Sequence, residues 1–353
     1  MIGPMETGDW LVAGLPGPEL TSAVERALAD LAPAGVILFA RNLKGVGQAR
    51  DLLAGVRETL GPARLLAVDE EGGPVNRLVG LSRVFGSLPD ARTQAGWGGD
   101  ELEEVWYRVG RTMAALGFNV DFAPVADLDD GPGANAIGRR SFGTDPGRAV
   151  ACAARVLAGL RRAGIAGCLK HFPGLGGTDL DTHLALAASP VDAAALRNAH
   201  ARPYRELRDV APLVMTAHAH YPAVDGAEPL PATFSRRLIE GWLRDDIGYD
   251  GLVISDDLEM GAVAGGGSPG TRARRAIEAG CDLALFCGDL DAPRRARDEL
   301  ARALKRGDLS AERLAATRRR KALVLGRLGP PAAAPPRFED EVEKLRTVLE
   351  EIA

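Results

Sequence analysis

The chain has 353 residues, of which 46% are hydrophobic and 26% charged, and its formal net charge at pH 7 is −5. The basic residues are dispersed, so the composition argues against a nucleic-acid-binding protein. No apolar run approaches the length that spans a bilayer, and no basic segment followed by an apolar core opens the chain. We therefore expect a cytoplasmic protein with no membrane-bound part.

Short apolar segments alternate with amphipathic segments along the chain. The segments expected to form strands are residues 10–14, 35–39, 64–69, 118–124, 166–172, 213–219, 251–257 and 283–287. The Ala- and Arg-rich segments expected to form helices are residues 19–31, 46–60, 101–116, 147–163, 193–209, 235–246, 271–280 and 292–306. This alternation predicts an α/β fold, a single-domain (β/α)8 TIM-type barrel, with a doubly wound open sheet as the alternative. The strands are continuously apolar, as in a parallel sheet covered on both faces.

The barrel is expected to span residues 1–310, because about 250 residues make a minimal barrel and insertions extend it. Residues 311–353 are expected to hold a basic helix, a Pro/Ala-rich linker at 329–338 and a C-terminal helix. In the basic helix, the run Arg318 to Lys321 is interpreted as a solvated face. An apolar stripe in the last helix should dock on the barrel, with a dimer contact as the alternative; it consists of Phe338, Val342, Leu345, Leu349 and Ile352.

The sequence predicts neither a metal nor a cofactor. The four cysteines lack zinc-type spacing and are interpreted as buried reduced thiols; they are Cys152, Cys168, Cys281 and Cys287. The glycine-rich stretch 174–177 lacks the Lys-Ser/Thr ending of a phosphate-binding loop. Lysine and arginine side chains near the candidate site would oppose a bound cation.

Ionisable residues gather where three of the predicted strands end. The segments are RLLAVDEEGGPVNR (64–77), KHFPGLGGTDLDTH (170–183) and GLVISDDLEM (251–260). Barrel enzymes carry their active sites at the carboxyl ends of the strands, so these groups should converge on one pocket. By position, the converging residues are Asp69, His171, His218 and Asp256, with Arg77 and Arg140 reaching inward from loops.

Carboxylates mixed with lysine, arginine and histidine suit a sugar, whose hydroxyl groups need both donors and acceptors. Glycoside hydrolysis requires an anionic nucleophile and a proton donor. Asp256, at a rigid strand end, is the candidate nucleophile. Asp181 and His183 lie on a flexible glycine-rich loop, and their spacing lets the carboxylate bind one imidazole nitrogen while the other faces the substrate. We therefore predict an acid/base dyad of these two residues.

The chain resembles glycoside hydrolase family 3 enzymes of the bacterial β-N-acetylglucosaminidase type. The resemblance covers the whole barrel, through LFARN (38–42), VDEEGGPVNR (68–77), IGRRSFG (137–143), KHFPGLGGTDLDTH and SDDLEM in the family's order. It implies that Asp256 is the nucleophile, His183 the acid/base and Asp181 its partner. It also implies a set of residues that bind the terminal N-acetylglucosamine, namely Asp69, Arg77, Arg140, Lys170 and His171.

Two positions depart from the family's usual motifs. Leu175 stands where the family writes a second histidine, in KHFPGHG, and Glu70 replaces the glutamine of DQEGG. Activity is expected to survive the first change. The second adds a charge that either disfavours an anionic leaving group or faces away from the site.

Some polar residues have a structural interpretation beside the functional one. Lys170 is also compatible with a buried charge paired with an acid, and His218 with a satisfied core histidine. Asp257 is expected to cap a helix or support the site. Asp121 and Asp127 are expected to stabilise the barrel rim, so they stay outside the predicted catalytic set.

The sequence thus predicts a metal-independent retaining exo-β-N-acetylglucosaminidase that removes nonreducing terminal N-acetylglucosamine from peptidoglycan fragments by double displacement. Three alternatives remain open. They are a β-glucosidase of the same family, a phosphorylase in which phosphate replaces water, and a catalytically silent sugar-binding protein.

Overall fold

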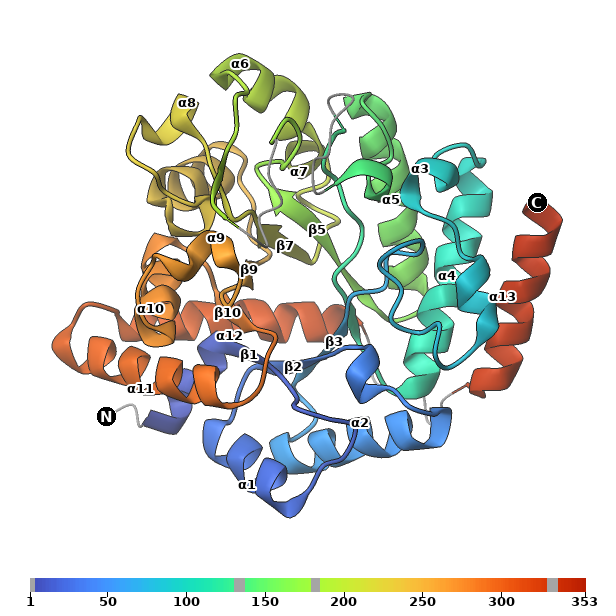
Figure 1. Ribbon diagram of the computed structural model, residues 1–353, viewed down its shortest axis with the longest axis horizontal. Coiled ribbons are helices and arrows are strands. Elements are labelled where there is room, and N and C mark those ends of the chain that lie inside the picture. Colours follow the sequence, from blue (N-terminus) through green and yellow to red (C-terminus); the bar gives the residue numbers. More distant parts are fainter. Residues whose placement is uncertain (1–3, 130–136, 179–184, 329–335) are drawn as a thin grey trace.

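The computed structural model describes residues 4–129, 137–178, 185–328 and 336–353. Its centre is a closed barrel of eight parallel strands in the spatial order β1, β10, β9, β7, β5, β4, β3, β2 (Figure 1). The strands are β1 Leu11–Gly14, β2 Gly35–Leu38, β3 Leu65–Val68, β4 Val120–Asp121, β5 Ala166–Phe172, β7 Leu213–Thr216, β9 Leu252–Asp257 and β10 Leu283–Phe286. The predicted (β/α)8 barrel is therefore confirmed. A two-stranded sheet pairs β6 (Ala187–Ala188) with β8 (Ala219–His220).

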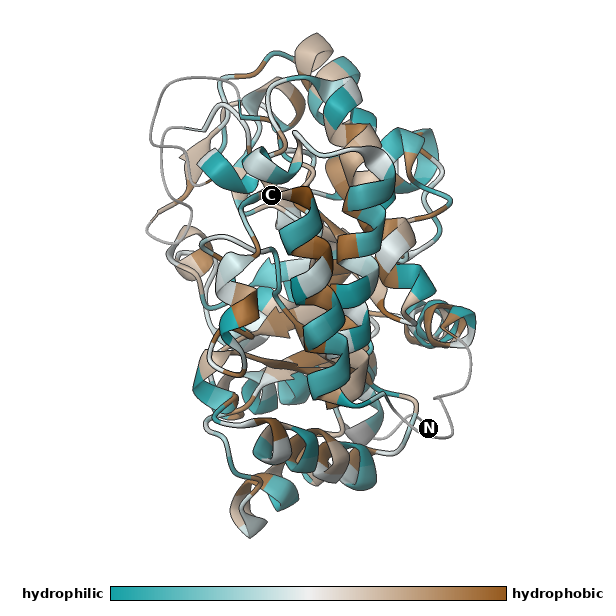
Figure 2. Ribbon diagram, turned by 90° about the vertical axis from the view of Figure 1, so that its right-hand side faces the viewer, coloured by the Kyte–Doolittle hydropathy of each residue, from teal (hydrophilic) through white to brown (hydrophobic). Residues whose placement is uncertain are grey.

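Helices surround the barrel as the apolar periodicity predicts (Figure 1). They include α1 Ser22–Leu31, α2 Val46–Leu60, α4 Gly99–Leu116, α5 Pro146–Arg162, α10 Pro269–Ala279 and α11 Asp291–Arg306. Several begin at a side-chain cap, as where Asp145 accepts the N–H of Arg148 at 2.8 Å. Figure 2 shows hydrophilic colours on the outer helix faces and hydrophobic residues toward the strands.

Two predicted helices differ in detail. The segment predicted as one helix over 193–209 is divided into α6 (Ala193–Ala195), the π-helical η5 (Leu196–His200) and α7 (Arg202–Glu206). Pro203 lies in the first turn of α7, and proline has no N–H to continue the preceding helix. The segment predicted over 235–246 is the π-helical η7 (Arg237–Asp246). The fourth strand also ends early, before Pro124, which cannot donate to the ladder.

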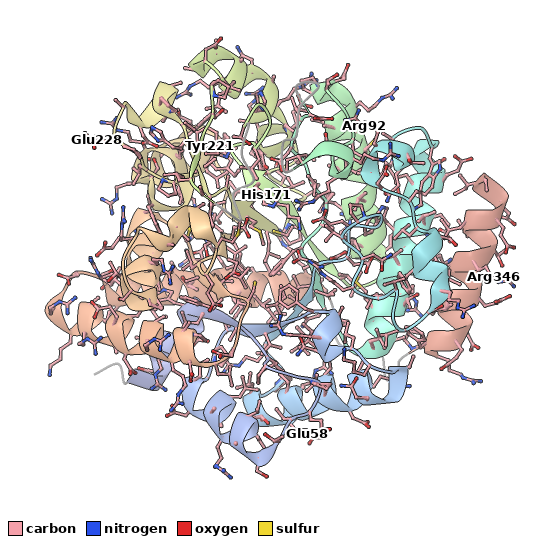
Figure 3. The ribbon with its side chains drawn as sticks, in the orientation of Figure 1. Glu58, Arg92, His171, Tyr221, Glu228 and Arg346 are labelled. Carbon is pink, nitrogen blue, oxygen red and sulfur yellow. The ribbon has the colours of Figure 1, made fainter. Side chains whose placement is uncertain are left out.

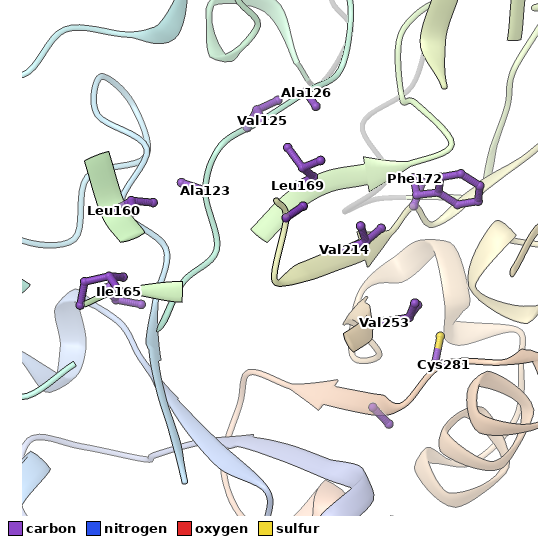
Figure 4. Packing of buried hydrophobic residues seen from close by; sticks show 14 of the residues in the cluster. Ala123, Val125, Ala126, Leu160, Ile165, Leu169, Phe172, Val214, Val253 and Cys281 are labelled. Carbon is purple, nitrogen blue, oxygen red and sulfur yellow. The ribbon is translucent and has the colours of Figure 1, made fainter. Parts of the chain in front are cut away.

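The strands separate two apolar layers. Alternate strand residues, among them Val12, Ile37 and Ile254, fill the barrel interior. The intervening residues pack outward against the helices, and Figure 4 shows Leu169 and Val214 in this outer layer. Both layers are almost fully buried, which explains why the strands read as continuous apolar runs.

Short elements connect the strands and helices on both ends of the barrel. On the side of the strands' carboxyl ends they include η2 Ala40–Asn42, η3 Arg83–Ser87, α3 Ala91–Gln94, η4 Gly138–Arg140, α8 Pro222–Asp225, η6 Ala232–Phe234 and α9 Gly261–Ala264. The segment η1 (Pro4–Trp10) precedes β1 and contacts α11 and α12.

The interpretation of the run Arg318 to Lys321 as a solvated face holds only for Arg319 of the basic helix α12 (Ala311–Arg327), because Arg318 and Arg320 are half-buried and Lys321 is buried. Arg318 and Lys321 each lie 2.7 Å from Asp9, which precedes β1. Arg320 contacts Asp282, which precedes β10, at 2.9 Å. These cations pair with acids at the amino ends of the strands. The pairs hold α12 across that end of the barrel.

The C-terminal helix α13 (Phe338–Ile352) packs along α4, as both views show (Figures 1 and 2). Phe338 and Leu345 of the predicted apolar stripe are buried. Glu341 lies 3.8 Å from Arg108 and 3.6 Å from Arg111 of α4. The stripe therefore docks on the barrel's outer helices within one chain.

Candidate active site

A cavity opens at the carboxyl ends of the strands. Its lining residues are Asp69, Glu71, Val75, Arg77, Arg140, Lys170, His171, Leu175, Met215, Asp256, Leu285 and Cys287. In Figure 3, His171 lies near the centre of the ring of strands. Every described residue that was predicted to be catalytic or to bind the sugar belongs to this lining, so the topology brings together Asp69, Arg77, Arg140, Lys170, His171 and Asp256.

Different parts of the barrel supply these side chains. Asp69 follows β3, Lys170 and His171 lie in the last part of β5, and Asp256 lies at the end of β9. Arg140 comes from η4, at the far side of an insertion between β4 and α5. Because all strands of the closed barrel are parallel, their carboxyl ends meet at one rim although the residues are far apart in sequence.

A buried ionic network forms one side of the cavity. Lys170 Nζ lies 2.9 Å from Asp69 Oδ1 and 2.6 Å from Glu71 Oε1. Arg140 binds Glu71 with both guanidinium arms, at 2.8 and 2.9 Å. Burial disfavours the Lys170 ammonium, but the two carboxylates outweigh it and hold the pKa of Lys170 above its usual range. The same cations overcome burial at Glu71 and hold the pKa of that carboxyl well below its usual range.

Glu71 is a site residue that the sequence does not single out. In the sequence it is one of three consecutive acids after the third predicted strand. The spacing offered a signal, because Glu71 is two residues from Asp69 in the same motif. Only the fold shows that its carboxylate lies between Lys170 and Arg140.

Asp256 is the carboxylate nearest His171 in the cavity. His171 Nε2 lies 3.9 Å from Asp256 Oδ2, and the N–H of Asp257 donates to Asp256 Oδ1 at 2.7 Å. Burial alone would raise the pKa of Asp256, yet the nearby imidazoles of His171 and His218 and the Asp257 N–H outweigh it, so the pKa lies below its usual value. Asp256 is thus anionic at neutral pH, as a nucleophile must be.

Asp257 has a supporting geometry. Its Oδ1 accepts the backbone N–H groups of Glu259 at 3.0 Å and Cys287 at 3.1 Å, and its side chain is absent from the cavity lining. Burial raises the pKa of Asp257 to about 6. These bonds join β9 to the end of β10 and agree with the expected supporting role.

His218 is a core histidine in the structure. Its Nδ1 lies 2.8 Å from Thr233 Oγ1 and its Nε2 lies 2.9 Å from the carbonyl of Asp257. Both ring nitrogens are therefore satisfied, the residue is fully buried, and burial lowers its pKa. His218 does not line the cavity, so its expected convergence on the pocket is wrong; it supports the strand end that carries Asp256.

Glu70 and Asp121 are buried beneath the site. Glu70 accepts the N–H groups of Arg77 at 2.8 Å and Leu78 at 3.1 Å, and Asp121 accepts the N–H of Glu70 at 2.9 Å. Burial raises the pKa of Glu70 to about 8. Glu70 is fully buried and outside the lining, so it faces away from a substrate and holds the backbone that carries Arg77.

The predicted dyad, Asp181 and His183, lies outside the described residues, which stop at 178 and resume at 185. The base of its loop is closely packed. Gly174 has a φ of +134°, and a Cβ on Gly176 would lie 2.4 Å from the carbonyl oxygen of Leu128. In this described part, the two glycines therefore allow a close approach of the backbone, whereas the sequence predicts a flexible loop.

Leu175, at the position of the family's second histidine, is buried and lines the cavity. Its N–H donates to Asp127 Oδ1 at 2.8 Å, and its carbonyl accepts the hydroxyl of Thr178 at 2.8 Å. The hydroxyl of Tyr221, labelled in Figure 3, donates to the carbonyl of Gly174 at 2.7 Å. These are backbone bonds of the loop, so they do not require a histidine side chain at 175.

The cysteines mostly follow expectation. Cys152, Cys168 and Cys281 are free and buried, but Cys287 is half-buried and lines the cavity. The interpretation of all four as buried thiols is therefore wrong for Cys287, because it follows the last strand at the open rim.

Among the described residues, no three metal-ligating side chains are grouped as a metal site. In the same part of the chain, each helix is too short or too polar to span a membrane.

The fold and the cavity define a barrel enzyme whose acids and bases converge at the carboxyl ends of its strands. The model of the glycosyl hydrolase family 3 N-terminal domain matches residues 11–324. The chain belongs to glycoside hydrolase family 3, and it is a glycosidase.

Named relatives cover most of the chain. A β-hexosaminidase of Alkalilimnicola ehrlichii is 39% identical over 290 residues, which are 80% of this chain and 81% of the relative. A β-hexosaminidase of Pseudomonas aeruginosa is 37% identical over 295 residues, 82% of this chain and 84% of the relative.

Solved structures are similar over nearly the whole fold. A glycoside hydrolase family 3 β-N-acetylglucosaminidase from Paenibacillus has a TM-score of 0.88 and 31% identity, covering 98% of this chain and 68% of that chain. A family 3 glycosyl hydrolase from Mycobacterium smegmatis has a TM-score of 0.80 and 32% identity, covering 92% of this chain and 97% of that chain.

Proposed function

We propose that the protein is a retaining exo-β-N-acetylglucosaminidase that removes nonreducing terminal N-acetylglucosamine. The observation that carries the proposal is the half-buried Asp256 carboxylate, which shares one cavity with Asp69, Arg140, Lys170 and His171. The names of the similar hexosaminidases and of the Paenibacillus β-N-acetylglucosaminidase support the choice of sugar.

The proposed reaction has two displacements at the anomeric carbon. Asp256 attacks and forms a bond to that carbon while the bond to the leaving oxygen breaks, and His183 gives its proton to the leaving oxygen. His183 then takes a proton from water, whose oxygen bonds to the anomeric carbon as Asp256 departs. Asp181 orients the imidazole and stabilises its cationic form.

Sugar binding is assigned to the network around Lys170. In this network, the Asp69 carboxylate accepts hydrogen bonds from the hydroxyl groups of the sugar. The cations donate hydrogen bonds to the same hydroxyl groups, from Lys170, Arg140 and Arg77. Arg77 Nη2 lies 4.0 Å from Asp69 Oδ2, and its guanidinium lies 5.4 Å from the Phe39 ring, so both contacts orient it.

Peptidoglycan fragments as the substrate are part of this proposal, and cytoplasmic localisation stays a prediction of the sequence.

A panel of aryl β-glycosides, each assayed with and without phosphate, tests the proposal. We expect faster turnover of the β-N-acetylglucosaminide than of the β-glucoside, and β-N-acetylglucosamine as the first product in proton NMR. An α anomer as the first product would contradict double displacement. A sugar phosphate formed only with phosphate would indicate a phosphorylase. A preference for the β-glucoside would indicate a β-glucosidase. Binding without turnover would indicate a silent sugar-binding protein.

A further inference from the structure

Asp127, in the segment after β4, is almost fully buried and holds two parts of the site together. Its Oδ2 lies 2.7 Å from His171 Nδ1, and its two oxygens lie 3.0 and 3.1 Å from the backbone nitrogen of His171. Its Oδ1 also accepts the N–H of Leu175 at 2.8 Å. One carboxylate thus binds a cavity-lining imidazole and the base of the adjoining loop.

The bonds to Asp127 determine the tautomer of the His171 imidazole and which ring nitrogen faces the cavity. A carboxylate only accepts hydrogen bonds, so the short contact requires the proton on Nδ1. The other ring nitrogen, Nε2, then faces the cavity, 3.9 Å from Asp256 Oδ2. Asp127 itself does not line the cavity, so it acts through His171.

The backbone of Asp127 reaches a third part of the site. Its carbonyl accepts the hydroxyl of Ser141 at 2.7 Å, and Ser141 directly follows Arg140 of the ionic network. The segment after β4 therefore contacts β5, the loop after β5 and the segment of Arg140. A small displacement of Asp127 would therefore shift β5, the loop after β5 and the segment that carries Arg140.

We infer that Asp127 is a positioning residue that sets the tautomer of His171 and anchors the base of the catalytic loop through Leu175. The inference rests on the proposed function for its kinetic consequence. The hydrogen bond to Asp127 uses only the backbone N–H of residue 175. The start of the loop can therefore be anchored in the same way with leucine in place of the family's histidine.

The substitution Asp127→Asn separates this role from simple packing. Three N–H groups converge on the carboxylate, two from His171 and one from Leu175, whereas an amide offers one acceptor oxygen and an NH2 group that can only donate. At least one of the three donors must therefore lose its partner although the side chain keeps its shape. Asp129→Asn is the matched control, because Asp129 contacts Arg92 at 2.6 Å and not His171.

Two measurements on the protein without substrate test the placement. The chain has five histidines, so the ring nitrogens of ¹⁵N-histidine-labelled protein can be assigned by NMR, with His171→Gln identifying the signals of His171. We expect the neutral His171 ring in the wild type to carry its proton on Nδ1, and the Leu175 N–H to exchange slowly. In Asp127→Asn, the ring signals should shift and the Leu175 exchange should accelerate at least tenfold.

The kinetic readout uses the aryl β-N-acetylglucosaminide. We expect Asp127→Asn to lower kcat/KM about a hundredfold, as small misplacements of binding groups do, and to change its pH profile. Asp129→Asn should stay within twofold of the wild type.

A wild-type His171 protonated on Nε2 alone, or fast exchange at Leu175, would overturn the inference, and neither outcome depends on the variant folding. A folded Asp127→Asn with the kinetics of Asp129→Asn would overturn it as well. If the wild type turned over no β-N-acetylglucosaminide, the proposed function would fail, while the NMR and exchange measurements would still decide the placement.

Discussion

Glu71 Oε1 lies 2.6 Å from Lys170 Nζ at the wall of the cavity, and both side chains are almost completely buried. Neither ion is stable there alone, because removing a charge from water costs several kcal/mol. The pair is completed by Arg140, which binds the same carboxylate with two hydrogen bonds. The positions of Lys170 and Arg140, two cations proposed to bind the sugar, therefore depend on one acid that is itself outside the predicted binding set.

Replacing that acid should damage stability and function together. We expect Glu71→Gln to lower the free energy of unfolding by about 3 to 5 kcal/mol, the usual cost of leaving a buried charge without its partner, and to raise KM. Urea unfolding and steady-state kinetics measure the two effects. Glu103→Gln is the control: Glu103 binds Arg155 and Arg162 on the surface, so its loss should cost less than about 1 kcal/mol. Equal costs for the two variants would show that burial of the Glu71 network contributes nothing special.

Glu70 gives a pH dependence of stability. Burial raises its pKa in the folded protein from the ordinary 4.5 to about 8, so between these two pH values the folded state retains a proton that the unfolded state has lost. The free energy of unfolding should therefore fall as the pH rises through this window.

Glu70→Gln removes the titration, and its amide oxygen still accepts from Arg77 and Leu78. Relative to the wild type, we expect the variant to gain stability from pH 5 to pH 8, by a few kcal/mol in all, and to gain nothing further above pH 8. Urea unfolding at pH 5, 7 and 9 measures this gain. Glu58→Gln, at an exposed position on α2 labelled in Figure 3, should show no such trend. A gain that did not change with pH would contradict a retained proton on Glu70.

The nucleophile is tested by a neighbouring pair of variants. Asp256→Asn should abolish turnover by several orders of magnitude without unfolding the barrel, because the amide keeps the shape and loses the anion. Asp257→Asn should retain more activity, since that side chain binds only backbone N–H groups. The opposite order, with Asp257→Asn inactive and Asp256→Asn active, would move the nucleophile by one residue.

The acid/base assignment has a leaving-group signature. His183→Ala should slow a disaccharide far more than a nitrophenyl glycoside, because a basic leaving alkoxide needs the proton most. With the nitrophenyl substrate, hydrolysis of the glycosyl-enzyme should become limiting and a burst of nitrophenol should appear in stopped flow. Asp181→Asn should show a milder form of this pattern. The same slowing of both substrates, without a burst, would leave His183 as a binding residue only and point to Asp179 as the acid.

The barrel and much of its site were predictable from local patterns. Apolar runs of four to seven residues and amphipathic periodicity identified the strands and most helices, because burial on both faces of a parallel sheet requires such runs. The rule that barrel strands present their carboxyl ends to one rim then brought Asp69, His171 and Asp256 together without any distance being known.

Partners distant in sequence were decided by the tertiary structure alone. The pairing of Glu71 with Arg140, of Asp127 with His171, and of Lys321 with Asp9 joins residues 69, 44 and 312 positions apart. No local pattern carries such pairings, because a polar side chain near a strand end looks the same whether it meets solvent, substrate or another charge. Burial makes the difference: a charge removed from water must find its partner nearby, and the packing of the whole barrel determines which one is there.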